Sequence, residues 1–138
     1  MSGSKTVVTA EIQLELLTVD GAGIGLHTTW SYDPQDPLAV RIDFLLPFGM
    51  GESWGFARTL LAEGLNAPAG EGDVLFDPET DGLHVLMMLR APDGAAVFRA
   101  PASELRAFLG RTLARLPLGA EQCGAALELW LHAVLDAA

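Results

Sequence analysis

The sequence predicts an α+β fold of about seven mainly antiparallel strands followed by C-terminal helices. Two observations carry this prediction. Apolar and polar residues alternate with a period of two in short segments up to residue 100, and turn residues separate the segments. At Pro101 the apolar spacing becomes helical. No repeat or linker divides the 138 residues, so we expect one domain over 1–138, strand-rich over 7–100 and helical over 101–137.

The first three strands have the clearest alternation. Residues 8–16 place apolar side chains on one face and polar ones on the other, and residues 26–32 repeat the pattern after a glycine-rich loop. A DPQDP turn at 33–37 leads into a third strand at 38–46. Leu38, Val40, Ile42, Phe44 and Leu46 there form the cleanest predicted core face.

The next elements are shorter. A strand around Trp54 and Phe56 precedes a helix at 57–65, and we expect Gly64 to end that helix. Two strands at 72–77 and 83–90 are joined by DPETDG, and a PDG turn at 92–94 leads into a last strand at 95–100.

Two helices complete the chain. Pro101 suits a helix start and Pro117 a stop, and a final helix begins near Ala120. That final helix has only a narrow polar stripe, so its apolar surface must pack on more than one side.

Composition limits the class of function. The net charge is −10 and residues 1–98 carry all of it, which argues against binding a polyanion. Half the residues are apolar and the mean hydropathy is +0.31, so we expect apolar surface shared with another subunit. No apolar run reaches the ~18 residues of a membrane span, and the N-terminus does not resemble a signal peptide. A single cysteine, Cys123, fits a reducing cytoplasm.

The segment WGFARTLLAEGLNAPAGEGDV at 54–74 invites comparison with a phosphate-binding loop. Gly64 and Gly70 have nearly the right separation, but Glu71 stands where a phosphate-binding loop needs lysine. Gly70 and Gly72 lead into a strand, whereas a dinucleotide loop leads into a helix. The segment is therefore interpreted as a helix stop followed by a tight turn with positive φ.

No metal, cofactor or catalytic site is predicted. DPETDG resembles the start of a calcium loop, but Met88 holds the position that needs glutamate, so an acidic hairpin turn is preferred. The histidines at 27, 84 and 132 are isolated in sequence, and Cys123 has no catalytic motif. An enzyme would require a pocket with polar groups gathered around Cys123 or a histidine.

Four motifs in order then resemble one family. They are YDPQDPLAV (32–40), WGFARTLLAEGL (54–65), PAGEGDV (68–74) and FLGRTLARLPLGAE (108–121). Together they resemble the SsgA-like sporulation and cell-division proteins of spore-forming actinobacteria. The apolar tail GAALELWLHAVLDAA and the loop 47–52 depart from that pattern.

The resemblance implies a Whirly-like barrel or sandwich with C-terminal helices, assembled as a homotrimer. It implies a non-enzymatic cytoplasmic protein at the division septum that helps position or recruit the tubulin-like protein FtsZ, directly or through another SsgA-like protein. Relatives with the Whirly fold bind single-stranded nucleic acid, and this is the alternative function. Arg99, Arg106, Arg111 and Arg115 could form the basic strip it needs, but the net charge favours a solvated helix face.

Two sets of residues are candidates for partner binding. Arg58 is a lone cation among apolar residues, so it either finds a partner inside its own fold or contacts another protein. The apolar face of the last helix either packs within the domain or contacts another chain. Its candidate residues are Leu127, Trp130, Leu131 and Val134.

Overall fold

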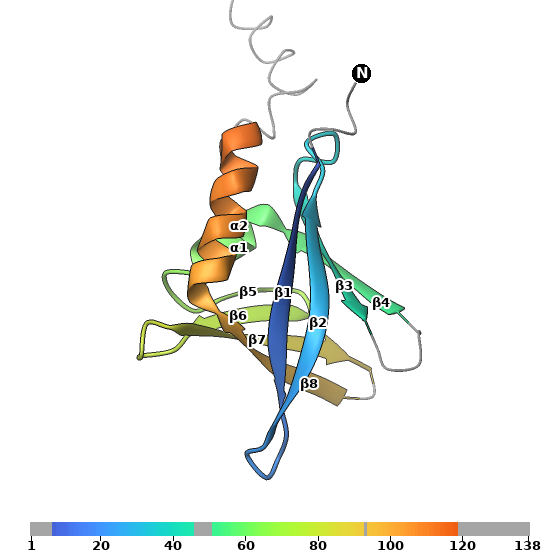
Figure 1. Ribbon diagram of the computed structural model, residues 1–138, viewed down its shortest axis with the longest axis vertical. Helices are drawn as coiled ribbons and strands as arrows, with labels where there is room; N and C mark the ends of the chain where they lie inside the picture. The colour runs from blue at the N-terminus through green and yellow to red at the C-terminus, as the bar shows by residue number, and fades with distance from the viewer. Residues whose placement is uncertain (1–6, 46–50, 93, 119–138) are drawn as a thin grey trace, which may run out of the picture.

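A single antiparallel sheet of eight strands curls into a nearly closed barrel in the computed structural model, which describes residues 7–45, 51–92 and 94–118 (Figure 1). The strand order is β4-β3-β2-β1-β8-β7-β6-β5. The elements are β1 Val8–Leu17, β2 Gly23–Tyr32, β3 Ala39–Leu45, β4 Gly51–Ala57, α1 Arg58–Gly64, β5 Ala69–Glu71, β6 Val74–Pro78, β7 His84–Ala91, β8 Gly94–Pro101 and α2 Ala102–Arg115.

The barrel has two halves that meet between β1 and β8. Strands β1 to β4 form a meander, with ten residue pairs between β1 and β2, and β5 to β8 form a second meander. The halves are joined through two pairs, Glu15 with Arg99 and Leu16 with Phe98. Because side chains alternate along each strand, one face of this curled sheet fills the interior.

Aromatic rings form the centre of the core. Trp30 packs edge-on against Phe56 and Phe108, and Phe56 packs in the same way against Phe76. These rings come from β2, β4, α2 and β6, so elements far apart in the sequence meet at one point. The buried hydroxyl of Thr28 accepts the Trp30 indole N–H and donates to the Ile12 carbonyl, which satisfies both groups inside the core.

The predicted order of elements is confirmed for the described residues, with differences at some strand starts and one missed strand. Strand β2 begins at Gly23 rather than near Leu26, because glycines in the expected loop extend the β1–β2 hairpin. The sequence also missed β5, a three-residue strand inside the glycine-rich part of residues 54–74. The predicted helix near Ala120, with Leu127, Trp130, Leu131 and Val134, lies outside the described residues.

The glycines of residues 54–74 serve different purposes. Gly72 has φ +61° in the tight turn between β5 and β6, as predicted. Gly64 ends α1, also as predicted, but it has no positive φ. A Cβ at Gly64 would lie 2.3 Å from the Cβ of Phe76, so glycine is required there because α1 packs directly on β6.

Arg58 connects three elements from the first residue of α1. Its guanidinium is fully buried and donates to the carbonyl oxygens of Thr112 at 3.1 Å and Pro117 at 3.3 Å. The guanidinium carbon lies 4.5 Å from the centre of the Tyr32 ring. The last carbonyls of a helix carry partial negative charge, so a buried cation here stabilises the C-terminal end of α2.

We predict that Gly64→Ala destabilises the fold by about 1–3 kcal/mol, because the added methyl overlaps Phe76. Gly110→Ala in α2 is the matched control, since nothing lies within 4 Å of its added Cβ. Helix propensity then predicts a gain of up to about 1 kcal/mol for the control. Urea unfolding measures both variants, and equal effects at the two positions would contradict the packing argument.

We also predict that Arg58→Met lowers the free energy of unfolding by about 2–3 kcal/mol, because it removes the buried charged donor to the carbonyls of Thr112 and Pro117. Arg106→Met, at an exposed position of the same helix, should change stability by less than about 0.5 kcal/mol. Thermal and urea unfolding of both variants test this. Similar stabilities would show that the buried guanidinium does not hold α2.

Candidate functional site: an apolar pocket beside strand β4

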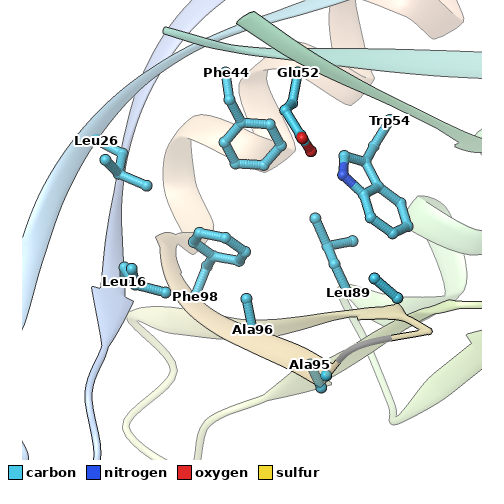
Figure 2. Close-up of a pocket in the computed structure, with 11 residues that line it drawn as sticks. Leu16, Leu26, Phe44, Glu52, Trp54, Leu89, Ala95, Ala96 and Phe98 are labelled. Atoms are coloured by element: carbon cyan, nitrogen blue, oxygen red, sulfur yellow. The ribbon is translucent and has the colours of Figure 1, made fainter. Parts of the chain in front are cut away.

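The barrel opens into an apolar pocket of about 390 Å³ (Figure 2). Leu16 and Leu26 line it near the β1–β2 hairpin, whereas α2 packs on Trp30 and Thr9 towards the other end of those strands. The pocket therefore lies at the end of the barrel away from α2. Its lining residues are Leu16, Leu26, Phe44, Glu52, Trp54, Leu89, Ala91, Gly94, Ala95, Ala96 and Phe98.

Strand alternation places the aromatic side chains of this pocket. Phe44 of β3 faces inward, and its ring centre lies 5.3 Å from that of Phe98 on β8. Glu52 pairs with Phe44 across the β3–β4 ladder, and Trp54 follows two residues later on the same face of β4. Trp54 is half-buried, so part of its indole surface forms the pocket wall.

Two polar groups interrupt the apolar wall. Figure 2 shows the carboxylate of Glu52 and the indole nitrogen of Trp54 on the same side of the pocket, opposite Leu89, Ala95 and Ala96. Within the described residues, neither group makes a hydrogen bond or ion pair with another side chain. Among the described residues, a carboxylate acceptor and an N–H donor therefore line the pocket without a side-chain partner.

A second surface lies on the outside of the barrel. Leu75 of β6, Leu86 and Met88 of β7, and Val97 of β8 point outward from neighbouring strands and are half-buried. We name these four residues the outer apolar face. They border a shallow cavity of about 360 Å³ together with the β5 residues Ala69 and Gly70. Outward apolar side chains on adjacent strands are typical of surfaces that another chain covers.

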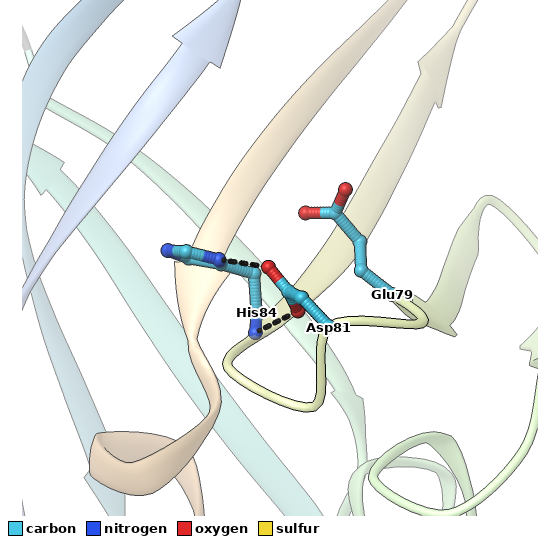
Figure 3. Close-up of side chains that lie close together, drawn as sticks. All are labelled: Glu79, Asp81 and His84. Carbon is cyan, nitrogen blue, oxygen red and sulfur yellow. Dashed lines mark hydrogen bonds and ion pairs between the residues drawn. The ribbon is translucent and has the colours of Figure 1, made fainter.

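The β6–β7 turn brings together Glu79, Asp81 and His84, whose ligand atoms lie within 4.8 Å of one another (Figure 3). Asp81 accepts hydrogen bonds from the backbone N–H of Leu83 at 2.8 Å and contacts His84 Nδ1 at 2.9 Å. The His84 contact is the main reason that the pKa of Asp81 lies below its usual value. The predicted acidic hairpin turn is confirmed, and a cation would have to displace these internal partners.

Arg99 occupies the other side of this turn. Its guanidinium contacts Glu79 at 2.8 Å and Glu15 at 3.2 Å, and these carboxylates raise the pKa of Arg99. Two acids therefore offset its charge, which removes Arg99 from a basic strip. Arg111 donates to the Thr9 carbonyl at 2.7 Å and ties α2 to β1.

Of the predicted site residues, Arg58 alone lies within the described part of the chain. Arg58 has the intramolecular partners that one of its two interpretations expected, and a contact with another protein would require its buried guanidinium to be uncovered. The candidates on the last helix, together with Cys123, lie outside the described residues. Sequence reasoning missed Glu52 and Trp54. The available signal was an acid in phase with Trp54 and Phe56, at an inward position of an alternating strand.

Known proteins resemble this chain in sequence and in fold. Residues 26–121 match the family model described as Streptomyces sporulation and cell division protein, SsgA. The sporulation-specific cell division protein SsgB of Frankia casuarinae is 41% identical over 116 residues, covering 83% of this chain and 81% of the relative. The SsgB of Streptomyces coelicolor is 39% identical over 118 residues, covering 84% and 86%.

A solved structure agrees with the sequence comparison. The crystal structure of an SsgA-like sporulation-specific cell division protein from Thermobifida fusca YX-ER1 superimposes with a TM-score of 0.81 at 35% identity. The match covers 96% of this chain and 98% of that one. Sequence and fold agree over most of both chains, and the chain belongs to the SsgA family of sporulation and cell-division proteins.

Proposed function

We propose that this chain is a non-enzymatic regulator of sporulation-specific cell division that helps position or recruit FtsZ at septum sites. The observation that carries the proposal is family membership: relatives near 40% identity over more than four fifths of the chain are named sporulation-specific cell division proteins. The general role in sporulation division rests on those names. The finer step to FtsZ rests on the motifs at 32–40, 54–65, 68–74 and 108–121.

The described site chemistry supports binding rather than catalysis. The described residues that line the pocket are mainly leucine, alanine and aromatic residues, with the carboxylate of Glu52. The other polar clusters are occupied internally, as in the contacts of Asp81 with His84 and of Arg99 with Glu79. No helix within the described ranges has the length and apolar character needed to cross a membrane. We propose that the protein acts in the cytoplasm at the septum.

We further propose that the chain works as a homotrimer. The outer apolar face is a suitable subunit contact because its residues lie on three neighbouring strands of a rigid sheet. The apolar residues of the last helix remain predicted contacts. A trimer would present each partner-binding surface three times, and a filament of FtsZ would present its own site repeatedly. Weak single contacts then add through effective concentration.

We predict that the purified chain pellets with polymerising FtsZ from the same organism and increases filament number or length. Co-sedimentation measures this, with an unrelated acidic protein of similar net charge as the control, because charge alone can trap proteins in a pellet. No enrichment over the control would contradict direct recruitment. The chain would then have to act through another SsgA-like protein.

We also predict that Met88→Lys reduces self-association, because a charge is placed in the outer apolar face. Sedimentation velocity should give about three times the 14.6 kDa chain mass for the wild type and a smaller mass for the variant. Gln13→Lys, at an exposed position of β1, is the control and should keep the wild-type mass. If Met88→Lys keeps the wild-type mass as Gln13→Lys does, the subunit contact lies elsewhere.

A further inference from the structure

We propose that the exposed edge of β4 and the adjoining pocket bind an extended segment of a partner protein by strand addition. In this arrangement the segment pairs with the β4 backbone. One of its large apolar side chains enters the pocket, and a basic side chain lies beside Glu52. The inference goes beyond the proposed function, because the geometry specifies the chemistry of the segment and does not require FtsZ to supply it.

The first step is that β4 ends the sheet. Strand β4 pairs with β3 on one side, and no strand among residues 7–45, 51–92 and 94–118 pairs with its other side. An edge strand presents a row of N–H and C=O groups that another extended chain can pair with. Proteins that bind peptides by strand addition gain affinity from these groups and specificity from side-chain pockets nearby.

The second step identifies which backbone groups face outward. The N–H of Arg58 donates to the Leu38 carbonyl at 2.8 Å, so this antiparallel pair is a hydrogen-bonded one. Hydrogen-bonded and non-hydrogen-bonded pairs alternate along an antiparallel ladder. The backbone groups of Glu52, Trp54 and Phe56 therefore bond to β3, and those of Ser53 and Gly55 point away from the sheet.

The third step is that these outward groups are accessible. Ser53 and Gly55 are both exposed. The Ser53 hydroxyl contacts Asp43 and Arg41 on the outer surface of β3, so this side chain is held back over the sheet. Gly55 has no side chain, and glycine within a strand often marks the close approach of another backbone. Within the described parts of the chain, no segment therefore covers the edge beside the pocket.

The fourth step concerns the pocket. Its cavity of about 390 Å³ is bounded by Trp54 on β4 and by Leu89 and Ala96 across from it. Burying a large aliphatic or aromatic side chain there supplies the apolar anchor that peptide-binding sites use. The indole N–H of Trp54, which has no acceptor among the described side chains, offers a donor to a carbonyl of the segment.

The fifth step selects the charge of the partner. Among the described residues that line the pocket, Glu52 is the one with a charge, and the chain as a whole carries a net charge of −10. An acidic segment would be repelled both locally and at a distance, whereas lysine or arginine beside Glu52 forms an ion pair. The expected ligand carries an apolar and a basic residue two positions apart, because alternate side chains of an added strand face the same side.

The experiment uses a phage-displayed library of random twelve-residue peptides, selected against the full-length protein. We expect enriched peptides to carry a large apolar residue and a basic residue two positions apart. A synthetic peptide of the enriched sequence is then titrated into isotope-labelled protein, and we expect its largest NMR shift changes at Glu52, Ser53, Trp54 and Gly55. Enrichment of no peptide, or shift changes confined to the outer apolar face, would overturn the proposal.

Three variants sharpen the result. Glu52→Lys should weaken peptide binding about fivefold or more. Gly55→Pro removes an N–H that the β3 ladder does not use, so it should abolish strand addition while the protein still folds. Glu11→Lys, a charge reversal at an exposed position of β1, should leave the affinity unchanged. Equal affinities of wild type, Glu52→Lys and Gly55→Pro would refute the site.

A concentration series without peptide tests whether a second copy of this chain, and not a foreign segment, occupies the pocket. If the resonances of Glu52 and Trp54 shift as protein concentration alone increases, a second copy of this chain fills the pocket, and a foreign segment is not its ligand. None of these measurements contains FtsZ. Failure of peptide binding therefore leaves the co-sedimentation test intact, and failure of co-sedimentation leaves the peptide test intact.

Discussion

The buried guanidinium of Arg58 is the contact on which the arrangement of the helices depends. Its backbone N–H closes the β3–β4 ladder on Leu38, and its side chain holds the end of α2 through Thr112 and Pro117. One residue thus fixes where β4 stops, where α1 begins and where α2 ends. A buried cation is unfavourable without such partners, so the surrounding chain can adopt few alternative packings. This constraint explains why arginine stands inside a motif that is mostly apolar.

The same junction determines where the barrel stays open. Beyond Ala57 the chain turns into α1, which packs on β6 through the contact of Gly64 with Phe76 rather than extending the sheet from β4. The ring of Phe56 on β4 contacts the ring of Phe76 on β6, and this contact fills the part of the barrel that lies next to α1. Trp54 lies two residues before Phe56 on β4, and its side chain faces Leu89 across the cavity of the pocket. The pocket is therefore a consequence of how the helix closes one part of the barrel and not the other.

Sequence patterns could predict the strands that have one buried face, because alternation over five or more residues identifies them. They could not identify β5, since three residues with two exposed positions carry no alternation. They explained Gly64 only in part, because the close approach of Phe76, twelve residues later, is a tertiary contact. Arg58 stands out in the sequence, but the carbonyls that its side chain contacts, those of Thr112 and Pro117, are more than fifty residues away. The pocket escaped prediction because its walls come from six different strands.

The two proposed surfaces can act together because they lie on opposite faces of the same strands. Leu89 and Ala96 face the pocket, whereas Met88 and Val97, their immediate neighbours, belong to the outer apolar face. Since side chains alternate, covering one face with a second subunit leaves the other face available. A partner segment on β4 would approach through the barrel opening and the sheet edge. Self-association through the outer face would then multiply the number of such edges without blocking them, which is the arrangement that a protein binding a repetitive filament requires.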